Sequence, residues 1–255
     1  FDDKGLVLIA PTLGELEALY FLTKKEKIPV KNVIISVLTD KTVSRAYSYL
    51  ENVTDKYNRS ILYFGNLNKK EVDSMSNKLK EFKIELIHSK IVYQLIENFK
   101  KYKEDVMKNM KDVLVKEGKI YYPCRLKVLE DHIYMRGGDD DLLFGIRVLK
   151  GKLSKNAILI ADNGKQIGKI TSIQKDKKEL DFAKINDEVC IRVEKVNPND
   201  ENIVYNRHFN SKNILQSKVD KEMLSLFIKL FKEELNKDKK YLLFIKEIIE
   251  SLNSK

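Results

Sequence analysis

Hydrophobic positions in the first 90 residues form short runs separated by longer amphipathic stretches. Runs rich in Ile, Val and Leu are typical of strands buried on both faces, whereas a period near 3.6 residues is typical of helices. Alternating strands and helices predict an α/β/α sandwich domain with a small parallel sheet over residues 1–90. The expected strands are 6–10, 32–37, 60–65 and 84–88, and the expected helices are 13–24, 42–50 and 70–82.

A helical pattern without glycine or proline continues from residue 91 to 116. Gly118 is a suitable end for this helix, and Pro123 prevents its continuation. We expect its first half to pack on the preceding domain and its second half to act as a connector, so that 91–118 forms a long connecting helix. Its apolar stripe is Val92, Leu95, Ile96, Phe99, Tyr102, Val106, Met110 and Val113.

Residues 119 to about 196 show short apolar runs that alternate with polar residues and are interrupted by Gly or Asn. This pattern predicts an antiparallel β-barrel with tight turns. Asn156 and Asn186 fall where strands must turn sharply, and asparagine tolerates a left-handed backbone better than most residues.

The chain ends with a strand at 213–219 and two helices, at about 221–235 and 239–252. Asp220 and Asp238 precede these helices and are suitable N-caps. We therefore assign residues 119–255 to a β-barrel with two C-terminal helices.

The 255-residue chain is basic, with 48 Lys and Arg against 38 Asp and Glu, a formal net charge of +10 and a pI near 9.2. Such a balance favours a polyanionic partner, although solvated surface lysines are the alternative. Cys124 and Cys190 lack ligand spacing, so we expect reduced thiols and no metal site. No apolar run approaches the roughly 20 residues of a membrane span. We expect a cytoplasmic protein and, because the chain opens with Phe1, a piece of a longer polypeptide.

The turn after the first strand is the place to look for a nucleotide, because a helix N-terminus can hold phosphate. Thr12 and Glu15 instead predict a capping box, which uses those N–H groups, and Glu17 would repel a phosphate. The chain has no GxGxxG or GxxxxGK[ST] motif. We predict structural capping here and no catalytic residues in this chain.

Histidines and clustered aspartates offer no catalytic or metal motif. His88, His132 and His208 are far apart and adjoin no nucleophile motif, so we expect structural or surface roles. Asp139 to Asp141 lack the spacing of a calcium loop and indicate a solvated hairpin tip.

Two segments near the C-terminus could bind a partner. Arg207, His208 and Phe209 could grip phosphate and stack on a base, or Phe209 could close the barrel end while Arg207 pairs with a carboxylate. The last helix has a wide apolar arc, so that Leu243 and Ile249 are either exposed or sandwiched.

Together these segments resemble the C-terminal half of eukaryotic and archaeal translation initiation factor 5B, a relative of bacterial initiation factor 2. The resemblance runs in order over nearly the whole chain. The segments that carry it are Thr12 to Leu19, Lys90 to Leu95, Tyr122 to Lys127, Gly168 to Ile173 and Arg207 to Phe209.

The resemblance implies a third domain, a connecting lever helix and a fourth domain that holds the acceptor end of methionylated initiator tRNA. It implies contact with both ribosomal subunits, support for subunit joining, and docking of the C-terminal tail of initiation factor 1A on the terminal helices. No DNA or membrane partner is expected. The expected tRNA contacts are Arg147, Lys150, Lys169, Arg207, His208 and Phe209. The expected tail contacts are Lys229, Lys232, Lys239, Lys246, Leu243 and Ile249.

Departures from the family pattern limit these expectations. The GTPase domain is absent, so GTP and magnesium would belong to a missing N-terminal domain and no cofactor is expected here. Asn156 and Asn186 stand where the family usually has glycine. The alternative function is a protein-interaction scaffold of a translation factor that makes no direct contact with RNA.

Overall fold

The computed structural model describes residues 2–138 and 141–254. It divides into two compact units, residues 1–110 and 111–255. The division falls inside one uninterrupted helix, whereas the predicted sections were 1–90, 91–118 and 119–255. In the described residues no helix is both long and apolar enough to cross a membrane.

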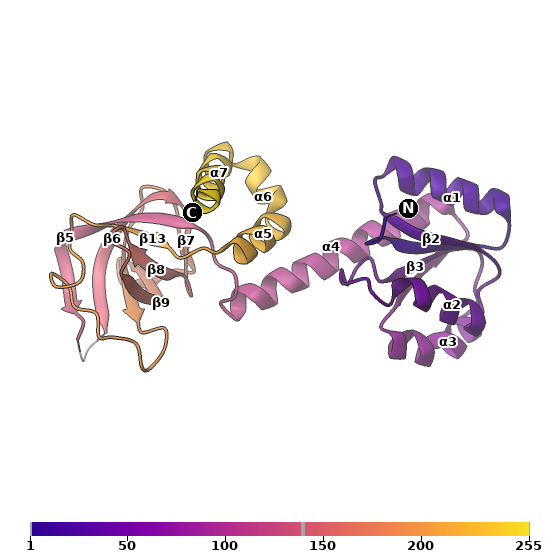
Figure 1. Cartoon of the computed structure of the whole chain (residues 1–255), viewed down its shortest axis with the longest axis horizontal. Coiled ribbons are helices and arrows are strands. Elements are labelled where there is room, and N and C mark those ends of the chain that lie inside the picture. Colours follow the sequence, from indigo (N-terminus) through magenta and orange to yellow (C-terminus); the bar gives the residue numbers. More distant parts are fainter. Residues whose placement is uncertain (1, 139–140, 255) are drawn as a thin grey trace. The chain divides into compact units, whose positions relative to one another are not determined.

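Unit 1 is a four-stranded parallel sheet with helices on both faces (Figure 1). Its strand order is β2-β1-β3-β4, and the fold class predicted for this part is confirmed. Each predicted element is present, with ends shifted by a few residues. The elements are β1 (Leu6–Ala10), α1 (Leu13–Lys25), β2 (Val30–Ile35), α2 (Asp40–Leu50), β3 (Ser60–Phe64), α3 (Lys69–Phe82), β4 (Glu85–Ser89) and α4 (Val92–Lys116).

The central strand β1 explains why this sheet needs two helical layers. All five of its residues are fully buried, and successive side chains point to opposite faces. Leu6 and Leu8 pack with residues of α1 and α4, whereas Val7 and Ile9 pack with residues of α2 and α3. A strand buried on both faces is continuously apolar, which is the pattern that predicted it.

Helix α4 is continuous, as predicted, and its partners change along its length. Leu95, Ile96 and Phe99 are buried in the core of unit 1. Val113, which we placed in the apolar stripe, is instead 52% exposed. The apolar contact in this last part comes from Leu114 and Val115, which pack on the core of unit 2.

Gly118 ends this helix, as predicted. Its φ of +69° is a left-handed conformation that costs glycine little. The N–H groups of Gly118 and Lys119 then donate to Val115 O at 3.1 Å and Leu114 O at 3.0 Å, so the last carbonyls of the helix are satisfied.

Unit 2 is a closed six-stranded antiparallel barrel followed by helices, as predicted (Figure 1). The strand order β9-β12-β6-β5-β13-β8 closes through the β8–β9 pair. Asn156 and Asn186 have φ of +67° and +69°, which confirms their role in sharp turns. The strands are β5 (Cys124–Arg136), β6 (Leu142–Gly151), β7 (Leu153–Ser154), β8 (Ile158–Ala161), β9 (Gln166–Lys175), β10 (Lys178–Glu179), β11 (Phe182–Ala183), β12 (Glu188–Glu194) and β13 (Ile214–Ser217).

Three helices, rather than two, follow the barrel: α5 (Lys221–Leu230), α6 (Lys232–Lys237) and α7 (Lys239–Asn253). The first predicted helix is broken at Phe231, whose backbone has φ −108° and ψ 15°. This ring is buried and stacks on Phe227 with the centroids 4.4 Å apart. The predicted N-caps are confirmed, because Asp220 and Asp238 accept from the N–H groups of Met223 at 2.7 Å and Tyr241 at 3.0 Å.

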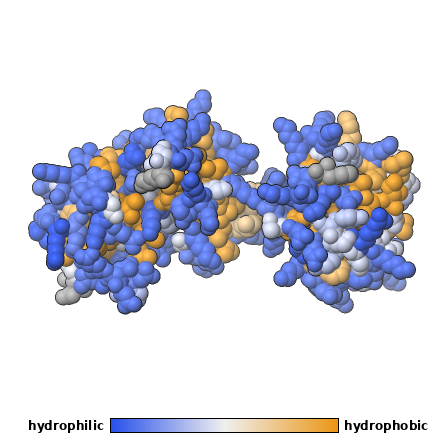
Figure 2. All heavy atoms as spheres, in the orientation of Figure 1, coloured by the Kyte–Doolittle hydropathy of each residue, from blue (hydrophilic) through white to orange (hydrophobic). Residues whose placement is uncertain are grey.

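The surface of each unit is mainly hydrophilic in the face shown by Figure 2, with hydrophobic residues visible between the polar ones. In unit 1, Phe21 and Tyr93 are each 68% exposed. In unit 2, Tyr134 and Leu243 are 61% and 59% exposed. Single exposed apolar side chains are ordinary on protein surfaces.

Candidate functional site

Two adjoining pockets lie at one end of the barrel. The larger, of about 450 Å³, is lined by the start of β6, by β9 and by the end of β12 with the segment that follows it. The smaller, of about 200 Å³, shares Ile167, Lys195 and Ile203 with it. A pocket of a few hundred Å³ that joins an apolar floor to a few polar groups is the usual form of a small-ligand site.

Gly168 allows two strands to meet closely at this pocket. Its φ is +148°, and a side chain there would place Cβ 2.4 Å from the carbonyl oxygen of Glu194. The β9–β12 pairing shifts register between Arg192 and Val193, beside this contact. A β-carbon at residue 168 would therefore push β12 away and change the pocket wall.

The long segment between β12 and β13 forms the outer wall. It contains no regular strand, and backbone hydrogen bonds tie it to the end of the β5–β6 hairpin. Gly138 N–H donates to Ile203 O at 3.0 Å, and Tyr205 N–H donates to Arg136 O at 2.8 Å. The buried rings of Tyr205 and Phe209, with centroids 5.4 Å apart, anchor the segment in the core.

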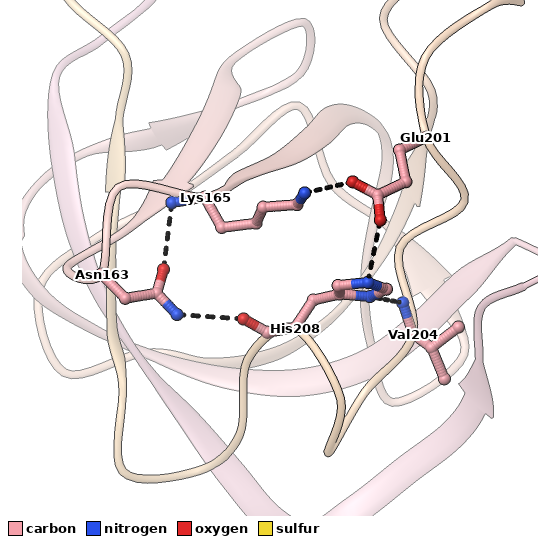
Figure 3. Close-up of polar contacts among 5 residues, drawn as sticks. All are labelled: Asn163, Lys165, Glu201, Val204 and His208. Atoms are coloured by element: carbon pink, nitrogen blue, oxygen red, sulfur yellow. Dashed lines mark hydrogen bonds and ion pairs between the residues drawn. The ribbon is translucent and has the colours of Figure 1, made fainter.

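His208 joins this segment to the β8–β9 turn (Figure 3). Its Nδ1 accepts from Val204 N–H at 2.8 Å, so the ring proton is on Nε2, which lies 3.2 Å from Glu201 Oε1. The other oxygen of Glu201 pairs with Lys165, and this hydrogen bond lowers the pKa of Glu201. The carbonyl of His208 accepts from Asn163 Nδ2 at 3.0 Å.

The three consecutive residues predicted to contact tRNA have different surroundings. Arg207 is exposed, whereas His208 has 12% of its side chain exposed and both ring nitrogens in use. Phe209 is 2% exposed and packs against Phe144 at 5.5 Å between centroids. A ring this buried cannot stack on a base, so the structure agrees with the alternative in which Phe209 fills the barrel end.

The other predicted tRNA contacts are spread over the barrel. Arg147 Nε donates to Glu188 at 2.8 Å, and Lys150 pairs with Glu247 of α7 at 2.8 Å. Lys169 lies directly opposite Glu194 in the β9–β12 pair. These side chains do not form one cluster with Arg207, and no measurement of RNA contact distinguishes them.

The predicted tail contacts lie on all three terminal helices. Lys239, Leu243 and Lys246 are exposed and follow one stripe of α7 at spacings of four and three residues. Ile249 is half-buried and packs on the core of unit 2. The last two are on other helices: Lys229 on α5 is half-buried, and Lys232 at the start of α6 is exposed.

The capping box predicted at the start of α1 is confirmed. Thr12 Oγ1 accepts from Glu15 N–H at 3.3 Å, and Glu15 Oε2 accepts from Thr12 N–H at 3.1 Å. The predicted aspartate tip is only partly visible, because Asp139 and Asp140 lie outside the described residues. Asp141 pairs with Arg192 at 3.0 Å. Within residues 2–138 and 141–254, no three His, Cys, Asp or Glu side chains gather as a metal site would require.

Sequence reasoning missed the charged residues that line the pockets. They are Asp141, Lys165, Glu194, Lys195, Asp200 and Glu201. They come from four separate segments, and none belongs to a recognisable motif. The only available signal was the charged run around residues 194–201 between two predicted strands, which reads as an ordinary solvated loop.

Comparison with known proteins first places the barrel in a class of translation-factor domains. The family described as Elongation factor Tu domain 4 matches residues 122–216. Human eukaryotic translation initiation factor 5B is 27% identical over 252 residues, which make up 98% of this chain and 20% of the human protein. The probable translation initiation factor IF-2 of Saccharolobus solfataricus is 30% identical over 97% of this chain and 38% of its own length.

The chain is therefore a homologue of eukaryotic translation initiation factor 5B and archaeal IF-2, as the resemblance indicated. It spans about a fifth of the human relative and 38% of the archaeal one. Among solved structures, the GDP-bound aIF5B of Aeropyrum pernix matches 97% of this chain and 38% of its own, with 21% identity and a TM-score of 0.45.

Proposed function

We propose that this chain is the part of a translation initiation factor that binds the acceptor end of aminoacylated initiator tRNA. The observation that carries the proposal is homology to initiation factors along 97–98% of the chain. The barrel supports it with a pocket of about 450 Å³ beside basic side chains. The net charge of +10 favours a polyanionic partner.

The acceptor end is single-stranded, so its phosphates and its esterified amino acid are both accessible to the barrel. Lys165 and Lys195 line the pockets, and Arg207 lies exposed on the segment that forms their wall. We assign phosphate contact to these cations and to Lys169. Arg147 and Lys150 could join them only by exchanging their present carboxylate partners for phosphate.

Further parts of the proposal concern the ribosome and a protein partner. We propose that the chain contacts both ribosomal subunits and supports their joining, and that the α7 stripe docks the C-terminal tail of initiation factor 1A. Lysines on both sides of Leu243 fit an acidic peptide with an apolar anchor. GTP binding and hydrolysis are assigned to a part of the factor outside this chain.

Filter binding of the whole chain to charged and uncharged initiator tRNA tests the main proposal. We expect charged tRNA to bind more tightly at every salt concentration, because the amino acid adds contacts that salt screens little. Elongator tRNA charged with the same amino acid is the control for selectivity. Weak binding that is indifferent to aminoacylation would instead favour the scaffold function.

A further inference from the structure

The larger pocket has two charged side chains without partners. Glu194 is the last residue of β12 and Lys195 follows it, and both are exposed and line this pocket. Among residues 2–138 and 141–254, neither side chain has a hydrogen bond or an ion pair. Its cross-strand neighbour Lys169 makes no ion pair with Glu194 either. A carboxylate and an ammonium group are thus free at one opening.

The remaining charged groups that line the two pockets are already engaged. Asp141 pairs with Arg192 at 3.0 Å. Glu201 is shared by Lys165 and His208. Asp200 accepts from the N–H of Asn197 at 2.9 Å. A charged ligand could therefore bind Glu194 and Lys195 without breaking a bond within the protein.

The floor between these two groups is apolar. Leu142, Ile167 and Val193 line the pocket and are 4%, 3% and 2% exposed. A matching ligand has a primary ammonium group for Glu194, an apolar side chain for the floor and an anion for Lys195. An amino acid esterified to the 3′ end of RNA carries these three groups within a short distance, with phosphate as the anion.

We propose that Glu194 selects an aminoacyl ester whose α-amino group is free, while Lys195 holds a neighbouring phosphate. This inference rests on the proposed binding of the tRNA acceptor end. Acylation of the α-amino group removes its charge, so the carboxylate of Glu194 loses an ionic partner and faces a neutral amide. Charge-assisted hydrogen bonds of this kind correspond to about 10- to 100-fold in affinity.

The test compares methionyl-tRNA, N-acetylmethionyl-tRNA and uncharged tRNA in filter binding to the whole chain. The measurements are made near pH 6.5, below the α-amino pKa of about 7.7–8.0 of model compounds, so that the free amine is protonated. We expect the native chain to bind the free amine at least about 10-fold more tightly than the acetylated form. Glu194→Gln should bind both forms equally, with its affinity for uncharged tRNA unchanged.

Glu179→Gln is the matched control, because Glu179 is exposed on β10 and pairs with Lys155 at 2.7 Å, away from the pocket lining. This variant should keep the preference for the free amine. Both substitutions preserve shape at exposed positions, and an unchanged melting temperature confirms that each variant is folded.

Two results separate failure of this inference from failure of the proposed function. If free and acetylated forms bind equally but more tightly than uncharged tRNA, the barrel binds the aminoacyl end and the role of Glu194 is overturned. The same holds if Glu194→Gln keeps the preference. If all three tRNAs bind alike, the proposed function itself is overturned, and this inference with it.

Discussion

Asparagine at two left-handed turns shows how a single residue shapes the barrel. Asn156 and Asn186 have φ near +68°, where a β-carbon is strained unless a short polar side chain offsets the cost. Asn186 N–H also donates to Val148 O at 2.8 Å, so its backbone position is fixed. The turn therefore depends on a residue that accepts this conformation.

We expect Asn186→Ala to lower the free energy of unfolding by about 1 kcal/mol, because alanine pays the full left-handed cost. Asn186→Gly should be close to neutral, since glycine relieves the strain but gains freedom in the unfolded chain. Urea titration followed by circular dichroism measures both. Equal loss in the two variants would show that the asparagine side chain, rather than φ, supports the turn.

Cys124 gives the barrel a dependence on alkaline pH. Burial raises the pKa of Cys124 to about 12, whereas a thiol in an unfolded chain ionises near about 8.5. Between these values the unfolded chain releases a proton that the folded protein keeps. The free energy of unfolding therefore falls as pH rises through this range.

Urea unfolding at pH 7.5 and pH 9.5 should show this fall in the native chain and a smaller fall in Cys124→Ala. Cys190→Ala is the comparison, because Cys190 is only half-buried and burial raises its pKa less completely. An identical pH dependence in native and Cys124→Ala proteins would assign the alkaline loss to other groups, such as the buried phenol of Tyr121.

At the scale of elements, helix α7 offers a surface that its sequence alone left open. Lys239, Leu243 and Lys246 share an exposed stripe, while Tyr241, Phe244 and Ile245 are buried on the other side. The wide apolar arc is thus mostly core, and one leucine remains outside. A docking peptide would meet two charges and one apolar contact.

We expect Lys239→Glu with Lys246→Glu to weaken binding of a peptide with the sequence of the initiation factor 1A tail, and the loss should shrink as salt rises. Titration of a labelled peptide followed by fluorescence anisotropy measures it. Lys221→Glu with Lys237→Glu is a control of equal charge on α5 and α6. If both double variants bind equally, the stripe is not the docking surface.

Most elements could be predicted because each follows from local pattern. The buried strand β1, the capped helix α1 and the turn at Asn156 need only hydrophobic period, capping chemistry and φ tolerance. The break at Phe231 could not, since the ring bends the chain to stack on Phe227, a tertiary contact. Helix propensity alone continues through that position.

The candidate site was harder to predict for the same reason. The segment between β12 and β13 has no periodic pattern, and its path is set by Ile203, Tyr205 and His208 through contacts with distant strands. The resemblance drew attention to Arg207, but spacing could not reveal that Phe209 lies in the core. Pocket residues such as Glu194 and Lys195 become recognisable only once the strands are placed.

For the whole molecule, net positive charge predicts that RNA binding depends on salt. Affinity should fall linearly with the logarithm of salt concentration, with a slope set by the number of phosphates contacted. We expect Arg207→Ala to reduce that slope by about 0.7 if it holds one phosphate of a single strand. Filter binding at several salt concentrations measures the slope.

Lys212→Ala is the matched control, because Lys212 is an exposed cation on the same segment and does not line either pocket. The control slope should match that of the native chain. An unchanged slope in Arg207→Ala would remove this arginine from the RNA contacts while leaving the other cations as candidates.

The end of helix α4 has a practical consequence for anyone who isolates the barrel by truncation. Lys111 pairs with Glu234 and lies 4.0 Å from the ring centroid of Phe231, and Leu114 and Val115 cover part of the same core. A recombinant piece cut at the first strand would uncover these apolar side chains and invite aggregation. One cut upstream of Lys111 keeps the seal that the helix provides.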